Sequence, residues 1–215
     1  MSMRPRQVAI RALILVGLSV LIFGQSGGRF EETKRQALAY LESDQFDRAA
    51  GKLEEIWDQD QSDATVAEGL GIAYLNGEDR RYHPEIVTKV RALMEKAVAN
   101  GGKATFLVQH SHEKLGFLQG KTINNYCSGS LSISRDRLIF VAHARKGIEP
   151  HSFDLGAGEF KISGPDADDK RGVFEIKAKS KNYAMAPRTR IKSDGDLVLT
   201  IVQENFTAKQ EQKGR

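Results

Sequence analysis

The chain has 215 residues, of which 40% are hydrophobic and 28% are charged, a composition that excludes wholesale disorder. Its formal net charge is +4, but residues 27–215 hold 29 Lys and Arg against 28 Asp and Glu, which removes the charge argument for binding nucleic acid. The single cysteine, Cys127, excludes an intramolecular disulfide and a cysteine-held zinc or iron–sulfur site.

The N-terminal segment 1–26 has the pattern of an export signal. Arg4 and Arg6 precede an apolar run from Ala12 to Gly24, and small residues follow up to Ser26. As a helix this run is about 20 Å long, shorter than a hydrocarbon core of about 30 Å, which favours a signal peptide cleaved after Ser26. The alternative is an uncleaved signal anchor, in which Arg11 reaches the cytoplasmic headgroups. In either case we expect residues 29–215 to be exported, as a periplasmic or secreted protein, or tethered to the membrane.

Residues 29–119 are predicted to form paired helices. Apolar residues recur at helical spacing from Phe30 to Trp57, with a break at Ser43 and Asp44, and Asp44 is expected to cap the second helix. The same pattern returns from Ala67 onward, and Asn100-Gly101-Gly102 ends it. A last helix from Ala104 to about Gly116 is expected to cap the helices.

This spacing resembles the tetratricopeptide repeat. The residues that carry the resemblance are Ala37, Tyr40, Phe46, Ala49, Ala67, Leu70, Gly71 and Tyr74. The second repeat departs from the family after Tyr74, where NGEDRRYHPE lengthens the turn. The resemblance implies a concave surface that binds a protein partner, and a generic four- or five-helix bundle is the alternative.

Residues 122–208 are predicted to form a β-rich module. Leu131 to Phe140 alternate as two strands around an Arg135-Asp136 turn. Further strands are expected over 152–155, 159–162, 173–179 and 182–186, because glycine, proline and aspartate punctuate the sequence between them. Short strands of this kind indicate an antiparallel sandwich or a small barrel.

A C-terminal helix is expected after Asp194, because Leu197, Val198, Ile201 and Val202 have the spacing of one helical face. Strands followed by one helix resemble the pleckstrin-homology-like architecture, in which the helix closes a barrel; a plain β sandwich is the alternative. Residues 209–215 are expected to be a frayed tail. The fold class is therefore α+β, a helical module followed by an antiparallel β barrel or sandwich.

The charge distribution supports two modules. Residues 29–100 hold 10 basic and 15 acidic side chains, a net charge of −5, whereas residues 101–215 hold 19 and 13, a net charge of +6.

Basic residues at alternate positions form the candidate anion-binding stripe. They are Lys177, Lys179, Lys181, Arg188, Arg190 and Lys192. The first three would share one face of a strand, where they could bind an anionic membrane surface or another polyanion. The alternatives are an ordinary solvated face, or lysines that protect a sheet edge from aggregation.

The side chains that could carry catalysis lack the motifs of an enzyme. His110 and His112 lie two positions apart and would face different directions on a helix, so they would share a metal only if the segment were extended. His143 and His151 fall in the β-rich module, and the histidines are interpreted as module-interface or surface residues rather than a zinc site. Cys127 with a histidine, or Ser128 or Ser130 as a hydroxyl nucleophile, would be a catalytic pair, but no nucleophile elbow, phosphate loop or dinucleotide fingerprint surrounds them. Cys127 is therefore interpreted as a core residue.

The sequence thus predicts a non-enzymatic, extracytoplasmic scaffold that binds a protein partner, with no cofactor, metal, nucleic acid or small-molecule substrate. The alternative is a peripheral module that binds anionic lipid or a polyanion.

Overall fold

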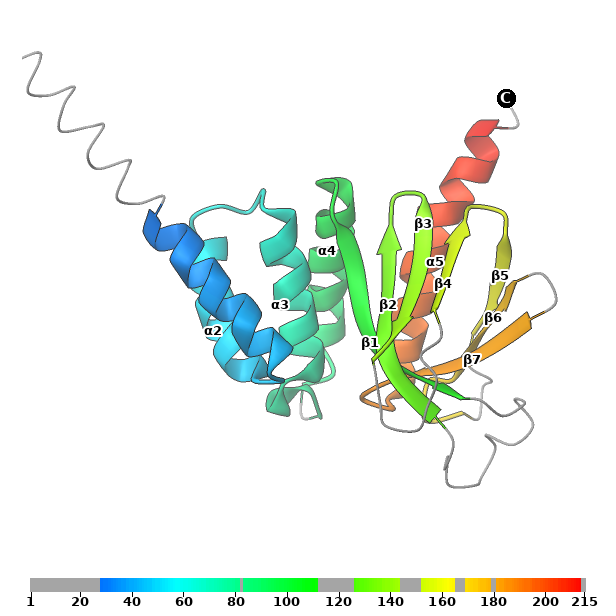
Figure 1. Ribbon diagram of the computed structural model, residues 1–215, viewed down its shortest axis with the longest axis horizontal. Helices are drawn as coiled ribbons and strands as arrows, with labels where there is room; N and C mark the ends of the chain where they lie inside the picture. Colours follow the sequence, from blue (N-terminus) through cyan, green and yellow to red (C-terminus); the bar gives the residue numbers. More distant parts are fainter. Residues whose placement is uncertain are drawn as a thin grey trace, which may run out of the picture.

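The computed structural model describes residues 28–81, 83–111, 126–143, 152–164, 169–178 and 181–213. Helices form one end of the molecule and a sheet forms the other, with the C-terminal helix lying against the sheet (Figure 1). The helices are a first helix over 28–42, α2 (Phe46–Trp57), α3 (Ala64–Asn76), the short η1 (Glu78–Arg81), α4 (Ile86–Ala99) and α5 (Lys192–Lys213). The strands are β1 (Lys103–Ser111), β2 (Tyr126–Ser134), β3 (Arg137–Ala142), β4 (Ser152–Gly156), β5 (Phe160–Ser163), β6 (Phe174–Ala178) and β7 (Lys181–Pro187).

The predicted helical hairpin is confirmed, but its turn differs from the prediction. Asp44 has a positive φ of 58°, while the backbone N–H groups of Asp44 and Gln45 bond to the carbonyls of Leu41 and Tyr40. These are the bonds of a Schellman motif, so Asp44 ends the first helix in the left-handed conformation. Gln45, not Asp44, occupies the N-cap position of α2, and it makes no side-chain capping bond.

The prediction of a last capping helix from Ala104 was wrong. Residues Lys103–Ser111 form strand β1, which is mostly buried and hydrogen-bonded to both β2 and β7. Alternate residues of a strand point to the same face of the sheet, and the apolar side chains of Ala104, Phe106 and Val108 all face the core. The sheet therefore begins before residue 122, within the range expected to be helical.

The remaining strands are confirmed, and they form one antiparallel sheet in the order β4-β3-β2-β1-β7-β6-β5. The predicted closed barrel is wrong, because β4 and β5 are the two edges of the sheet. The sheet is nevertheless strongly curved: Phe153 of β4 and Tyr183 of β7, which are not neighbouring strands, have ring centroids 4.7 Å apart. Only a turn separates Gly156 from Phe160, which keeps these two edges within about 14 Å of each other there.

The concave face of the sheet holds the main core. Leu197, Val198, Ile201 and Val202 of α5 are all at most 3% exposed and pack there, as their helical spacing predicted. Leu75, Val90 and Met94 from α3 and α4 belong to this same cluster, while a second cluster lies between the helical hairpins. The helical and sheet parts therefore share a hydrophobic core.

Helix α5 runs to Lys213, beyond the point at which fraying was expected. No helix among the described residues is long and apolar enough to cross a bilayer. The apolar run from Ala12 to Gly24 lies outside the described residues, so its role as an export signal stays a prediction.

Candidate protein-binding surface

The repeat-signature residues pack the helices against one another. Six of the eight are buried: Ala37, Phe46, Ala49, Ala67, Leu70 and Gly71. A Cβ atom at Gly71 would lie 2.6 Å from the Met94 methyl group, so this glycine allows α3 and α4 to approach closely. Tyr40 and Tyr74 are half-buried, and a partner could contact only these two of the eight.

Tyr74 lies between two helices and contacts a charged side chain on each. Its hydroxyl donates a hydrogen bond to the Glu54 carboxylate of α2, and Lys89 Nζ of α4 donates to the hydroxyl at 2.7 Å. The same ammonium lies 4.0 Å from the centre of the Tyr74 ring, a cation–π contact. Burial, and next the neighbouring Glu54, raise the pKa of Tyr74 well above its ordinary value, so the phenol remains a neutral donor.

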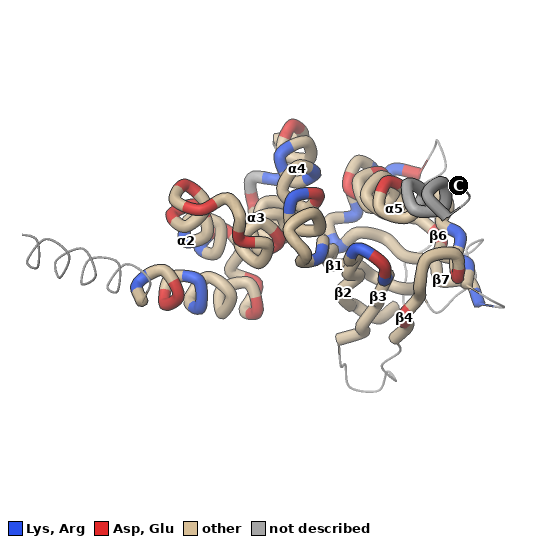
Figure 2. Tube along the Cα trace, turned by 90° about the horizontal axis from the view of Figure 1, so that it is seen from above, with Lys and Arg blue, Asp and Glu red and all other residues tan. Residues whose placement is uncertain are grey.

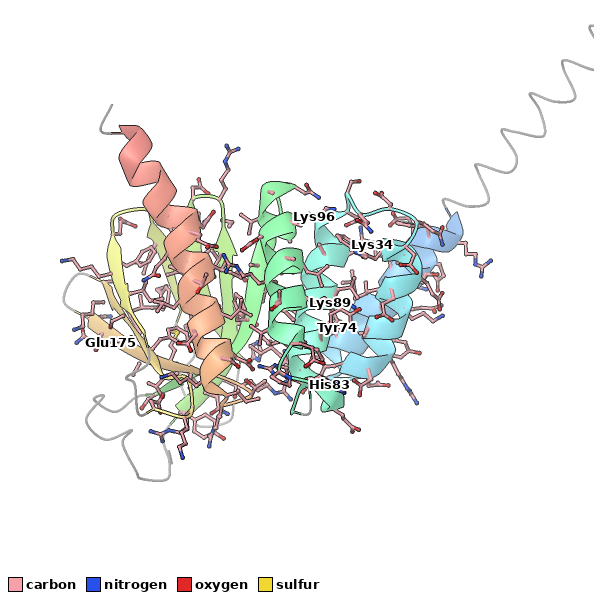
Figure 3. The ribbon with its side chains drawn as sticks, turned by 180° about the vertical axis from the view of Figure 1, so that it is seen from behind. Lys34, Tyr74, His83, Lys89, Lys96 and Glu175 are labelled. Atoms are coloured by element: carbon pink, nitrogen blue, oxygen red, sulfur yellow. The ribbon has the colours of Figure 1, made fainter. Side chains whose placement is uncertain are left out.

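Trp57 forms a second aromatic contact with α4. Lys96 Nζ lies 5.0 Å from the centre of the Trp57 ring. Trp57 follows Glu54 by one turn of α2, and Lys96 follows Lys89 by two turns of α4, so both contacts lie on the same side of the helices. Figure 3 shows Tyr74, Lys89 and Lys96 on this side. We call Glu54, Trp57, Tyr74, Lys89 and Lys96 the aromatic–lysine surface.

The predicted lysine stripe does not exist as one strand face. Strand β6 ends at Ala178 and β7 begins at Lys181, and Lys179 lies outside the described residues. Lys181 is paired with Ala178, and Lys177 with Asn182, so Lys177 and Lys181 point to opposite faces of the sheet. Lys177 also forms an ion pair of 3.0 Å with Glu175.

The other three basic residues of that prediction follow β7 and are separate from Lys177. Arg188 donates two hydrogen bonds to the Asp44 carboxylate and lies 5.4 Å from the Phe46 ring centre. Arg190 has a positive φ of 54° and donates to the Gln109 side chain. Lys192 is the first residue of α5. Figure 2 shows basic and acidic residues interspersed along the first helix and α2.

The nucleophile and histidine candidates divide between the two faces of the sheet. Cys127 is 1% exposed, and its sulfur lies 3.7 Å from Nδ1 of the buried His110. Burial raises the pKa of the Cys127 thiol, which disfavours the thiolate that a nucleophile requires. Ser130 Oγ lies 3.0 Å from His143 Nε2 on the outer face of the sheet, while Ser128 is exposed. His112 and His151 lie outside the described residues.

No protein-family model and no curated protein matches this chain. Among solved structures, the C-terminal domain of an unknown protein from Leishmania infantum is 11% identical, with a TM-score of 0.34 over 60% of this chain and 94% of that one. A structure of Vav1 inhibited by an allosteric inhibitor is 10% identical, with a TM-score of 0.30 over 81% of this chain and 61% of that one. A structure concerning the PH and C1 domains of the Vav1 exchange factor is 8% identical, with a TM-score of 0.26 over 81% of this chain and 62% of that one. These three structures share with this chain only a coarse layout of helices and a sheet. None of them is named as a tetratricopeptide-repeat protein.

Sequence reasoning missed most of the aromatic–lysine surface. It identified Tyr74, through the repeat resemblance, but not Glu54, Trp57, Lys89 or Lys96 as its neighbours. The heptad spacing of Lys89 and Lys96 was an available signal, because it places two cations on one face of a helix.

Proposed function

We propose that this protein is a non-enzymatic interaction scaffold that binds a protein partner on its aromatic–lysine surface. The observation that supports this most is that two large aromatic side chains from different helices, Trp57 and Tyr74, stay half-exposed on one side of the helical layer. Tryptophan and tyrosine are enriched among the residues that dominate protein-binding energies. The fitting partner offers apolar groups to the rings and carboxylates to Lys89 and Lys96.

The two family resemblances belong to this proposal. Ala37 and Tyr40 lie on the first helix, and Gly71 and Tyr74 lie on α3 with the same spacing between them, so successive hairpins repeat the same positions. This supports a tetratricopeptide-like interpretation of the helices. Seven antiparallel strands followed by α5 support a pleckstrin-homology-like order of elements in the sheet part. The proposal requires no cofactor, metal or catalytic step, and it places residues 29–215 outside the cytoplasm.

Site-specific photocrosslinking in the native membrane or extract tests the scaffold. A photoreactive amino acid replaces Lys96 in one protein and Lys52 in another. Lys52 is a half-buried lysine of α2, and its ion pair among the described residues is a local one with Glu55. We expect a defined protein adduct from position 96 that is absent from position 52, and its loss when Trp57→Ala is added. Equal adducts from both positions, or an adduct that Trp57→Ala leaves unchanged, would contradict the proposal.

A second candidate function, binding to an anionic membrane surface, is favoured by one pairing in the sheet. Lys161 of β5 lies directly opposite Lys177 of β6, and like charges in such a pair destabilise a sheet. Glu175 forms an ion pair with Lys177, whereas the exposed Lys161 ammonium forms no ion pair within the part of the chain that the structure describes.

Vesicle flotation distinguishes this second function from the scaffold. Lys161→Glu combined with Lys177→Glu should abolish binding to vesicles that contain phosphatidylglycerol, and leave binding to pure phosphatidylcholine unchanged. The second comparison is needed because the apolar N-terminal run could itself insert into either membrane. Unchanged flotation with phosphatidylglycerol would exclude this function.

A further inference from the structure

A group of polar side chains lies on the outer face of the sheet, opposite the core. Leu107 of β1, Ser130 of β2 and Val141 of β3 are consecutive partners across this face, and Val141 is 52% exposed. The backbone N–H of Arg188 bonds to the Leu107 carbonyl at 2.8 Å, which places Arg188 at the end of the same row. His143 continues β3, with its backbone N–H bonded to the Ser128 carbonyl.

We call Gln109, Ser130, His143, Arg188 and Arg190 the outer-face cluster. Ser130 and His143 are bonded to each other at 3.0 Å, and Arg190 donates to Gln109 through two nitrogens at 3.0 and 2.8 Å. Hydroxyl, imidazole, amide and guanidinium groups all donate hydrogen bonds to anions. The cluster contains no acidic side chain of its own.

Among the described residues, a carboxylate from the helical hairpin reaches this cluster. Asp44 accepts hydrogen bonds from both terminal nitrogens of Arg188, at 2.7 and 2.9 Å, and interacts electrostatically with His143. The paired arrangement is the geometry in which a guanidinium binds a carboxylate from any source. Phe46 contributes an aromatic ring beside the same guanidinium.

Asp44 combines the turn that ends the first helix with the carboxylate that pairs with Arg188. Its φ of 58° lies in the left-handed region, which glycine occupies most readily and which asparagine and aspartate occupy more often than other residues. A glycine would complete the turn with less strain, but it would offer Arg188 no carboxylate.

We propose that the outer-face cluster binds a carboxylate side chain of an acidic peptide segment, and that Asp44 occupies this position as an internal competitor. The planar fork of Arg188 fits a carboxylate, and Leu107, on the neighbouring strand, offers an apolar contact beside it. The peptide is preferred over a long polyanion because residues 27–215 carry a net charge of only +1. This site lies on a different part of the molecule from the aromatic–lysine surface and does not depend on it.

The exposure of the Asp44–Arg188 pair permits such exchange. Its side chains are 56% and 43% exposed, and pairs of this kind contribute at most about 1 kcal/mol, or about fivefold in an equilibrium constant. An external carboxylate therefore competes with Asp44 at a small cost.

The same sheet contains a matched control. Arg137 of β3 and Asp154 of β4 form an exposed pair of 2.7 Å on the outer face, separate from the cluster. Asp154→Asn removes the same charge as Asp44→Asn, and Arg137→Gln removes the same charge as Arg188→Gln.

Fluorescence anisotropy of a labelled hexa-aspartate peptide, with the full chain in a non-ionic detergent, tests the proposal. We expect Asp44→Asn to bind up to about fivefold more tightly than the unmodified chain. Arg188→Gln should bind at least about tenfold more weakly, because the two-pronged contact of the guanidinium with a carboxylate is lost. Asp154→Asn and Arg137→Gln should leave the affinity within about twofold, and a hexa-glutamine peptide should not bind.

Three outcomes overturn the proposal. The first is an equal gain in affinity from Asp44→Asn and Asp154→Asn, which would show a general charge effect. The second is undiminished binding by Arg188→Gln, and the third is no peptide binding by any variant. If Arg188→Gln fails to fold, Ser130→Ala combined with His143→Gln replaces it, and unchanged affinity in that variant overturns the proposal in the same way.

Discussion

Among the ion pairs that join the helical part to the sheet part and α5, two differ mainly in their exposure. Arg80 of η1 is paired with Asp194 of α5, and their side chains are 4% and 0% exposed. Asp44 of the hairpin turn is paired with Arg188 after β7, at 56% and 43% exposed. The chemistry of the two pairs is the same, but their surroundings give them different roles.

At the buried junction, the partners have little access to water. Asp194 also accepts a hydrogen bond from Thr189, and Arg80 also donates to Ser193 Oγ at 2.9 Å. Arg80 Nε, in contrast, has no hydrogen-bond partner among the described residues. A buried pair of this kind adds little net stability, but the loss of one partner leaves a charge that water cannot solvate.

At the exposed junction, water can replace either partner. The Asp44–Arg188 contact therefore holds the hairpin tip weakly and can be exchanged. The comparison indicates that the Arg80 junction is a permanent part of the fold, whereas the Asp44 junction is open to competition by a ligand.

The largest predicted effect is at the buried junction. Asp194→Asn keeps the shape of the side chain but leaves the Arg80 charge unpaired, so the free energy of unfolding should fall by about 3–5 kcal/mol. Urea unfolding followed by circular dichroism measures this change. The control is Asp196→Asn, on the same helix but exposed, which should have little effect. A similar loss in both variants would show that the burial of the pair does not matter.

Met94→Ala tests whether the two parts unfold together. Met94 is fully buried, fills the space beside Gly71 and belongs to the core shared with the sheet. Its truncation should lower the free energy of unfolding by about 2–4 kcal/mol while leaving one transition, because helices and sheet share that core. Leu38→Ala, at a half-buried position of the first helix, is the milder control. Two separate transitions in the Met94 variant would mean that the helical part unfolds independently.

The parts of the fold that the sequence predicted are those in which periodicity decides the structure. The alternation from Leu131 to Phe140 and the helical spacing from Leu197 to Val202 both follow the burial of one face. Strand β1 had the same alternation, but its position directly after helical residues led to the wrong prediction. Asn100-Gly101-Gly102 and the run of Ala104, Phe106 and Val108 were sufficient to identify it.

The ion pairs could not be predicted in this way. Asp44 and Arg188 are 144 residues apart, and Arg80 and Asp194 are 114 residues apart, so only the tertiary fold brings them together. The lysine stripe failed for a related reason: the period-two spacing of Lys177 and Lys181 assumed one continuous strand, whereas they belong to two paired strands.

The contact of Glu68 on α3 with β1 predicts a smaller change in the free energy of unfolding, and one that depends on pH. Burial raises the pKa of Glu68 on α3, although hydrogen bonding from Thr105 and the charge of Lys103 on β1 oppose it. A raised pKa in the folded state means that stability is greatest below the unfolded pKa of about 4.3 and is lost as the pH rises through the folded pKa. Glu68→Gln should therefore unfold at a higher urea concentration than the unmodified chain at pH 7. The difference should disappear below about pH 4, and a difference that persists there would exclude titration of Glu68 as its cause.

The smallest predicted effect is at the exposed junction, where loss of the ion pair and relief of backbone strain change the free energy of unfolding in opposite directions. Asp44→Gly loses an exposed ion pair but relieves a positive φ, so the free energy of unfolding at pH 7 should change by less than about 0.5 kcal/mol. Asp44→Ala loses the pair and keeps the strained backbone, and should be less stable than Asp44→Gly by about 1 kcal/mol.

The pH dependence of these variants separates the contribution of the ion pair from that of the backbone strain. The hydrogen bonds from Arg188 lower the pKa of Asp44, so the contribution of the pair is present above the unfolded pKa of about 3.9 and is lost as the pH falls through the folded pKa. Asp44→Gly should therefore gain stability relative to the unmodified chain under acid conditions, because only the relief of strain remains. An advantage for glycine that stays constant from neutral to acid pH would mean that the ion pair contributes nothing, and that Asp44 leaves the Arg188 guanidinium fully available to a ligand.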